Sequence, residues 1–246
     1  MDNPFISIVI PAYNEEKRLP MTLKLITEYL GQEKYVFEII VVDDGSTDGT
    51  AEMVREYASG NNNFNIRLFQ NAANRGKGFS VRSGVLVSHG DYIFFSDADL
   101  STPIEEIEKL LLRLKDGCDV VFASRGMLSS KVIVREAWYR DKMGKIFGFL
   151  VRNLAVRGIR DSQCGFKGFR RETAMRLFGM QTIKGFAFDV EILFIAKKLK
   201  MRMAEIPVCW VDSPKSKVNP ISDSLKMLFE LFTICLNDKL GKYRYV

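Results

Sequence analysis

The sequence predicts a doubly wound α/β fold, in which a mostly parallel sheet carries helices on both faces. Along the first half of the chain, continuous Val, Ile and Phe runs alternate with segments of helical apolar spacing. Such runs are typical of strands buried on both faces of a parallel sheet. Polar, glycine-containing segments follow these strands, which is where parallel sheets bind ligands. The length of 246 residues and the hydrophobic fraction of 47% suit one large domain of this class.

The elements of the first half alternate strictly between strand and helix. The apolar runs predict strands at residues 5–10, 37–42, 66–69, 92–95 and 119–123. Apolar residues three and four positions apart predict helices at residues 19–30, 47–57, 78–87 and 104–114. Pro11 ends the first strand, and Pro103 stands near the first turn of the last helix, where proline is favoured.

The second half is predicted to extend the same domain, because it shows neither a linker nor an internal repeat. A basic amphipathic helix is expected at 138–156, a strand at the end of 161–170, a helix at 188–199, a strand at 204–211 and a helix at 221–236. In this last helix several apolar side chains fall near one face, namely Leu225, Leu228, Phe229, Phe232 and Cys235. Core packing, membrane contact and dimerisation all fit that pattern, and the sequence leaves the oligomeric state open.

The net charge of +6 is concentrated in one part of the chain. Residues 131–176 contain twelve basic and four acidic side chains, a net charge of +8, which leaves about −2 for the remainder. This asymmetry indicates an anionic partner, either nucleic acid, an anionic membrane or a phosphorylated substrate, although a solvated basic face explains it equally well.

Cysteine and histidine usage excludes several classes of protein. The four cysteines form no C-x-x-C pair, so they are expected to be reduced thiols of a cytoplasmic protein. The single histidine, His89, excludes chemistry that needs two histidines and makes a Ser-His-Asp triad improbable. No apolar run reaches the length of about 20 residues that a membrane span needs, and no signal peptide is visible. A soluble or peripherally bound protein is expected.

The motif Asp97-Ala98-Asp99 follows the expected strand 92–95. Two carboxylates at a strand end can bind a hard divalent cation through oxygen ligands. Mg²⁺ or Mn²⁺ held in this way can neutralise charge on a departing diphosphate. Turns are rich in aspartate for structural reasons too, so the preceding buried strand is what favours a functional interpretation.

Two more polar segments follow strands. The carboxylates of Asp43 and Asp44 can accept hydrogen bonds from a base or ribose, although a turn with a helix cap also explains this segment. Residues 74–78 place two cations and two glycines before a helix, which suits an anion near the helix N-terminus. Neither G-x-x-x-x-G-K-[ST] nor G-x-G-x-x-G is present there, which weakens a P-loop ATPase or an NAD-dependent enzyme as an interpretation.

Together these segments resemble the family 2 glycosyltransferases of the GT-A fold. The matching stretches are residues 8–16 (IVIPAYNEE), 41–46 (VVDDGS), 74–78 (NRGKG) and 97–99 (DAD). Later stretches resemble the dolichyl-phosphate glucosyltransferase branch, to which dolichyl-phosphate mannosyltransferases are close relatives: 160–167 (RDSQCGFK), 185–191 (GFAFDVE) and 205–210 (EIPVCW). The resemblance implies one GT-A (nucleotide-diphospho-sugar transferase) domain over residues 1–246. Residues 1–125 would form the nucleotide-sugar half, and 126–246 the acceptor half with basic amphipathic helices.

The resemblance also implies roles for individual residues. Asp99 and Asp189 would be catalytic, and Asp97 and Asp99 would bind Mg²⁺ or Mn²⁺. The nucleotide-sugar would be bound by Pro11, Ala12, Tyr13, Glu15, Asp43, Asp44, Lys77, Asp97, Ala98, Arg125, Gln163 and Lys217. Of these, Arg125 and Lys217 would contact the phosphates. Ser101 stands where the mannosyltransferase pattern often has Gln, which leaves a third protein ligand to the metal open.

The function expected from this resemblance is inverting transfer of a hexose, glucose from UDP-glucose, to a polyprenyl or dolichyl phosphate. A phosphate acceptor is already ionised and needs no general base, but it does need a cationic pocket, which residues 135–171 are placed to supply. Their amphipathic helices would rest on lipid headgroups at the cytoplasmic face of a membrane.

Three alternatives stay open from the sequence. Mannose from GDP-mannose would use the same lipid acceptor. A hydroxyl acceptor would require a base, Asp189 or Glu191. A nucleotide-binding protein without turnover is the remote alternative. Nucleic acid is not expected as a partner, because the aromatic residues of the basic half have core-like helical spacing.

Overall fold

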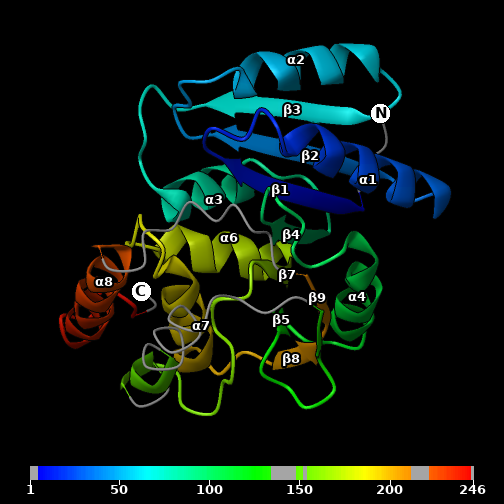
Figure 1. The fold of residues 1–246 in the computed structure, drawn as a ribbon. Coiled ribbons are helices and arrows are strands. Elements are labelled where there is room, and N and C mark those ends of the chain that lie inside the picture. The colour runs from blue at the N-terminus through cyan, green and yellow to red at the C-terminus, as the bar shows by residue number, and fades with distance from the viewer. Residues whose placement is uncertain (1–4, 134–147, 152–153, 212–221, 245–246) are drawn as a thin grey trace.

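The computed structural model describes residues 5–133, 148–151, 154–211 and 222–244. Seven strands form one sheet in the order β3-β2-β1-β4-β7-β5-β8 (Figure 1). They are β1 Ile6–Ala12, β2 Phe37–Asp43, β3 Asn65–Gln70, β4 Tyr92–Ser96, β5 Val120–Ser124, β7 Phe166–Arg170 and β8 Met203–Pro207. All neighbours pair in parallel except β7, which runs antiparallel between β4 and β5. The predicted α/β class with a mostly parallel sheet is confirmed.

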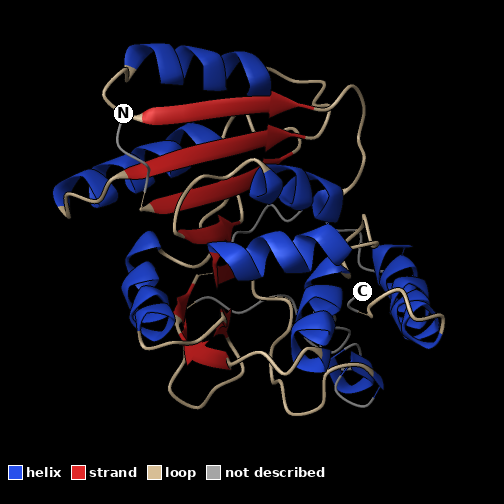
Figure 2. Cartoon of the chain, turned by 180° about the vertical axis from the view of Figure 1, so that it is seen from behind, coloured by secondary structure: helices blue, strands red, loops and turns tan. Residues whose placement is uncertain are grey.

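Helices cover both faces of this sheet (Figures 1 and 2). They are α1 Leu19–Gln32, α2 Thr50–Gly60, α3 Lys77–Leu86, α4 Ile107–Lys115, α6 Arg171–Met180, α7 Phe188–Lys198 and α8 Ser222–Lys239, with a 3₁₀ turn at Ile104–Glu106. One core lies between the sheet and α1, α2 and α4, and the other between the sheet and α3, α6, α7 and α8. Strand β1 contributes to both, because Ile8 and Ile10 face the first core and Val9 the second.

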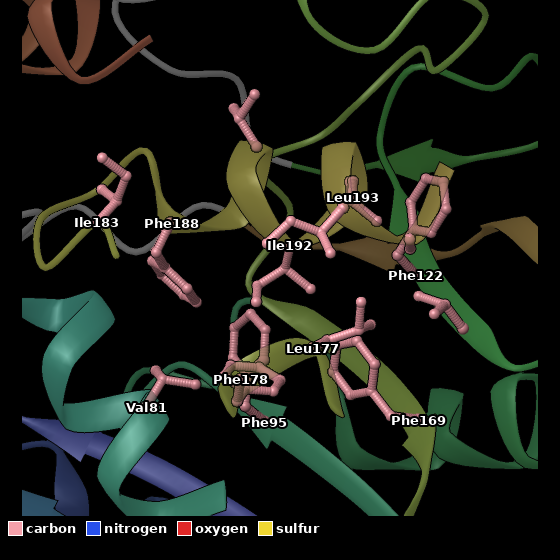
Figure 3. Packing of buried hydrophobic residues seen from close by; sticks show 14 of the residues in the cluster. Val81, Phe95, Phe122, Phe169, Leu177, Phe178, Ile183, Phe188, Ile192 and Leu193 are labelled. Carbon is pink, nitrogen blue, oxygen red and sulfur yellow. The ribbon is translucent and has the colours of Figure 1, made fainter. Parts of the chain in front are cut away.

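The core on the α3 side is rich in aromatic side chains. The rings of Phe95 in β4 and Phe188 in α7 have centroids 5.5 Å apart, and Phe169 meets Phe178 edge to face at 5.3 Å (Figure 3). Aromatic pairs of this kind stabilise the fold by more than the burial of their apolar surface alone. Because Phe188 is the first residue of α7, this packing fixes the start of the helix that carries Asp189.

The first half agrees with the sequence prediction, with element ends shifted by three residues or fewer. Shifts of three residues occur at α2, which begins at Thr50 and not at residue 47, and at α4, which begins at Ile107 after the 3₁₀ turn. Thr47 and Asp48 instead form hydrogen bonds with the loop after β1: Thr47 N donates to Asn14 Oδ1 at 2.8 Å, and Glu16 N donates to Asp48 Oδ2 at 3.3 Å.

The second half differs more from the prediction. The prediction of a single strand at 204–211 is wrong, because β8 ends at Pro207. The next strand, β9 Cys209–Trp210, pairs with β6 Lys131–Val132 in a separate two-stranded sheet. Helix α6 was not predicted at all. The helices expected at 188–199 and 221–236 correspond to α7 and α8. The helix expected at 138–156 lies mostly outside the described residues. Within that range the structure describes 148–151 and 154–156, and residues 148–151 and 154 are helical.

Within the described ranges, every helix falls short of the length or hydrophobicity that a bilayer span requires.

Candidate active site

The aspartate pair lies in a tight turn at the end of β4. Asp97 N donates to the Gly165 carbonyl oxygen at 3.1 Å, and the Thr22 hydroxyl donates to the Ala98 carbonyl oxygen at 2.6 Å. Leu100 closes the turn with a φ of 45°, a left-handed conformation that is uncommon for leucine. Surrounding contacts must hold such a turn in place, and strained turns of this kind cluster at functional sites.

A cluster of two lysines and two aspartates lies beside this turn, with charges that alternate in the order Lys167, Asp189, Lys77 and Asp97. Lys77 Nζ lies 2.6 Å from Asp97 Oδ1, and Lys167 Nζ lies 2.6 Å from Asp189 Oδ1. Lys167 is fully buried. Burial raises the pKa of Asp189 above its usual value, against the lowering effect of Lys167 and Lys77. Burial alone would lower the pKa of Lys77, but the negative charges of Asp97 and Asp189 raise it.

Asp99 completes the carboxylate pair. One of its oxygens accepts a hydrogen bond from Ser101 N at 3.1 Å. Burial and, next, the negative charge of Asp97 raise the pKa of Asp99, and a bound cation would relieve that repulsion. Among the described residues, no three or more His, Cys, Asp and Glu side chains group as metal ligands. The two carboxylates fit a Mg²⁺ or Mn²⁺ ion that takes its other ligands from water and substrate phosphate.

The loops that follow β1 and β2 are joined by hydrogen bonds. Besides the bond from Thr47 to Asn14, Gly49 N donates to Glu16 Oε2 at 2.9 Å. These bonds bring together, at one edge of the sheet, Pro11, Ala12, Tyr13, Glu15, Asp43 and Asp44. The ring of Tyr13 is on the surface of this edge, since the residue is 39% exposed.

The carboxylates of Asp44 and Glu15 are engaged by protein donors. Asp44 accepts from the backbone N of Arg75 at 2.9 Å and of Gly76 at 2.8 Å, so it holds the loop that leads into α3. Glu15 accepts from Arg18 Nε and Nη2 at 2.7 and 2.6 Å. Both carboxylates therefore shape the loops of the site, and their direct contact with a nucleotide stays a prediction.

Arg125, just after β5, is held by Asp161. Its Nε and Nη2 donate to the two carboxylate oxygens at 2.7 and 3.1 Å, and its guanidinium lies 5.2 Å from the ring centroid of Trp210. Burial opposes ionisation of Asp161, but the charge and hydrogen bonds of Arg125 outweigh it and lower the pKa to about 2. Gln163 N also donates to Asp161, at 3.1 Å. A small pocket beside the aspartate turn includes Trp210 in its lining, together with Ser96, Asp97, Ser101, Thr102 and Gly165.

Glu191, the other base considered from the sequence, is fully buried away from this cluster. Its Oε1 accepts from the hydroxyls of Thr182 and Tyr243, both at 2.6 Å, and its Oε2 accepts from Ile183 N at 2.8 Å. These bonds tie the C-terminal segment to α7, so the structure favours Asp189 over Glu191 for a role in the site. Lys217 lies outside the described residues.

Comparison with known proteins identifies the family. Residues 7–178 match the model described as Glycosyl transferase family 2. The chain belongs to glycosyltransferase family 2. It is 37% identical to the dolichyl-phosphate beta-glucosyltransferase of Dictyostelium discoideum over 254 residues, covering 99% of this chain and 78% of that protein.

Solved structures share the fold of this family 2 glycosyltransferase. Mannosyl-3-phosphoglycerate synthase from Rubrobacter xylanophilus has a TM-score of 0.70 at 16% identity, covering 99% of this chain and 77% of that one. Glucosyl-3-phosphoglycerate synthase from Mycobacterium tuberculosis, in complex with Mn²⁺ and UDP-glucose, has a TM-score of 0.69 at 19% identity, covering 94% of this chain and 79% of that one. The expected GT-A fold is therefore confirmed.

The site of this glycosyltransferase also contains residues to which the sequence assigned no role. Lys167 lies in an apolar strand, and a buried lysine there requires a charged partner, which Asp189 supplies. Gly165 is needed where it is, because a Cβ there would lie 1.9 Å from Asp97 Oδ2. Both residues lie in the stretch 160–167 that carries the resemblance, which was the available signal, but that stretch alone gave neither of them a role.

Proposed function

We propose that this enzyme transfers glucose from UDP-glucose to a polyprenyl or dolichyl phosphate, with inversion at the anomeric carbon. The observation that carries the proposal is the 37% identity to a dolichyl-phosphate beta-glucosyltransferase, which extends over 99% of this chain and so includes both proposed halves. Transfer from the α-linked sugar of UDP-glucose to a β-linked product requires inversion. A lipid acceptor would place the enzyme at a membrane, and we propose that this is the cytoplasmic face.

Asp97 and Asp99 would hold the metal at the end of β4. When bound, Mg²⁺ or Mn²⁺ supplies positive charge for the departing diphosphate. Lys77, which pairs with Asp97, and Arg125, which pairs with Asp161, would add cationic groups for the donor phosphates. Mn²⁺ and UDP-glucose in a structural neighbour support this donor and metal, although that neighbour shares only 19% identity.

The buried pair of Lys167 and Asp189 would serve the acceptor side. With a phosphate acceptor no base is needed, and the pair would orient the sugar or the acceptor. The raised pKa of Asp189 favours the second candidate, a hydroxyl acceptor, because a carboxylate with a raised pKa is a better proton acceptor. Asp189→Asn distinguishes the two: it should cost several orders of magnitude in rate with a hydroxyl acceptor and less with a phosphate acceptor.

Calorimetric titration with UDP and with GDP, each with Mn²⁺ and with EDTA, tests the donor. We expect UDP to bind in a metal-dependent way and Asp99→Asn to abolish the metal dependence. Tight binding of GDP alone would replace glucose by mannose as the transferred sugar. If folded protein binds neither nucleotide, the proposed transfer is refuted.

A further inference from the structure

Helix α8 is apolar on two opposite faces. Met227, Leu231 and Ile234 are buried against the rest of the domain. A second set, which we call the outer stripe, faces away from it and is between 54% and 70% exposed: Leu225, Phe229, Phe232, Leu236 and Leu240. Leu240 follows the helix directly, and its N still donates to the Leu236 carbonyl oxygen at 2.9 Å. The helix therefore presents a second apolar face that the described residues leave largely uncovered.

The outer stripe is narrow and continuous. At 100° per residue its five side chains fall within an arc of about 80°, and they extend over about 22 Å of helix. Leu154 adds an exposed apolar side chain beside α8, since it is 46% exposed and its carbonyl oxygen lies 3.8 Å from Cys235 Sγ. Contiguous exposed apolar surface of this kind marks an interaction site, whereas single exposed residues do not.

The charges on α8 favour a lipid surface over a protein surface. By the same helical spacing, Lys226 and Lys239 flank the outer stripe on either side, whereas Asp223 and Asp238 lie on the far side of the helix. Both of these carboxylates are neutralised by ion pairs, Asp238 with Lys198 and Asp223 with Lys226 at 3.4 Å, so Lys239 is the flanking lysine without such a partner among the described residues. An apolar face flanked by lysines is the pattern of a helix that lies in the plane of an anionic membrane, with its lysines at the headgroups.

The same helix contacts, through its inner side, the segment that leads into α7 and Asp189. Glu230 accepts hydrogen bonds from Gly185 N at 3.1 Å and Ala187 N at 2.9 Å, directly before the start of α7 and Asp189. The neighbouring Lys184 carbonyl oxygen accepts from Phe79 N in α3, at 3.1 Å. In Figure 1, α8 lies on the side of the molecule where the loop between β3 and α3 descends to the start of α3. A surface that binds α8 would therefore lie near the site.

We propose that the outer stripe of α8 docks on the lipid bilayer that contains the acceptor. The identity of the acceptor rests on the proposed function, but the docking face rests on the exposed side chains and their flanking lysines. Docking would hold the carboxyl edge of the sheet close to the headgroups, where the phosphate of a polyprenyl lipid lies.

Co-sedimentation with vesicles of phosphatidylcholine and phosphatidylglycerol tests the docking face. The variant is Phe229→Ser with Phe232→Ser, and the control is Leu25→Ser with Leu112→Ser, which changes exposed leucines on α1 and α4. We expect the double Phe variant to lose at least about tenfold in vesicle affinity, because burial of one aromatic side chain contributes about a factor of ten or more. The control should bind as wild type does.

Two results would overturn the inference. One is vesicle binding that does not differ between wild type and the Phe variant, whether both bind equally or neither binds. The other is a dimer, seen by light scattering, that only the Phe variant loses, which would make a second copy of the chain the occupant. The circular dichroism spectrum and the melting temperature of the Phe variant, compared with those of wild type, check that it is folded.

Transfer to a short, water-soluble prenyl phosphate tests the proposed function separately. The Phe variant should keep this transfer and lose transfer to a long-chain polyprenyl phosphate in vesicles. If wild type fails with both acceptors while the stripe still governs vesicle binding, the proposed acceptor is wrong and the docking face stands.

Discussion

Replacement of Asp161 by Asn should destabilise the protein in a pH-dependent way. The Asp161 carboxylate is nearly buried and holds Arg125 through two hydrogen bonds, and its pKa is lowered from 3.8 to about 2. One pKa unit corresponds to 1.36 kcal/mol, so ionised Asp161 contributes about 2 kcal/mol to the free energy of unfolding. Because the folded pKa lies below the unfolded one, this contribution is complete above pH ~4 and is lost as the pH falls towards 2.

Urea unfolding at several pH values between 7 and 3 measures this contribution. At pH 7 Asp161→Asn should lower the free energy of unfolding by about 2 kcal/mol, or the melting temperature by roughly 4–8 °C. The difference from wild type should shrink as the pH is lowered towards 3. Asp116→Asn, which removes an exposed carboxylate, is the control and should change stability by about 0.5 kcal/mol or less. A difference of the same size at pH 7 and pH 3 would refute the assignment to the ionised carboxylate.

Three further substitutions test the packing of the site. Lys167→Met should lower the free energy of unfolding by about 3–5 kcal/mol, because it leaves Asp189 buried without its partner. Gly165→Ala should abolish metal-dependent UDP binding while the protein stays folded, because its Cβ would displace the Asp97 carboxylate. Tyr243→Phe should lower the free energy of unfolding by about 1–3 kcal/mol, since it removes a hydroxyl donor from a buried carboxylate of α7.

Each of these substitutions has a matched control. Lys24→Met removes a lysine from an exposed ion pair and should cost about 1 kcal/mol or less. A Cβ at Gly179 meets no atom within 4 Å, so Gly179→Ala should keep UDP binding. Tyr35→Phe removes a hydroxyl bond to Glu108 at a half-buried position and should cost less than Tyr243→Phe. Equal losses in variant and control would contradict the assigned contact in each pair.

The first half of the fold was predictable because its apolar runs are long and its strands are parallel. In the second half, α6 was missed because its apolar residues come in short runs broken by Arg171, Glu172 and Arg176, although Thr173, Ala174, Leu177 and Phe178 form a buried face at helical spacing. The break between β8 and β9 was missed because the apolar pattern continues through Val208. Only the backbone shows that the chain leaves the main sheet after Pro207, where one hydrogen-bond donor is missing.

The candidate site was predictable where its residues follow parallel strands. Asp97 and Asp99 follow β4, Asp44 follows β2 and Arg125 follows β5, so strand ends alone placed them on one edge. The pairing of Lys167 with Asp189 could not be predicted, because it depends on the packing of α7 against the sheet. The contacts of Asp161 are equally dependent on the tertiary fold.

The antiparallel direction of β7 explains why the later motif reaches the same edge. In a parallel strand the residues after the strand meet the ligand, whereas in an antiparallel strand the residues before it do. Phe95 in β4 pairs with Lys167 in β7, so the chain before β7 runs beside the aspartate turn, and Gly165 accepts the hydrogen bond from Asp97 N. Asp161 and Gln163 arrive at the site by this route. One reversed strand thus brings the motif at 160–167 to the aspartate turn after β4.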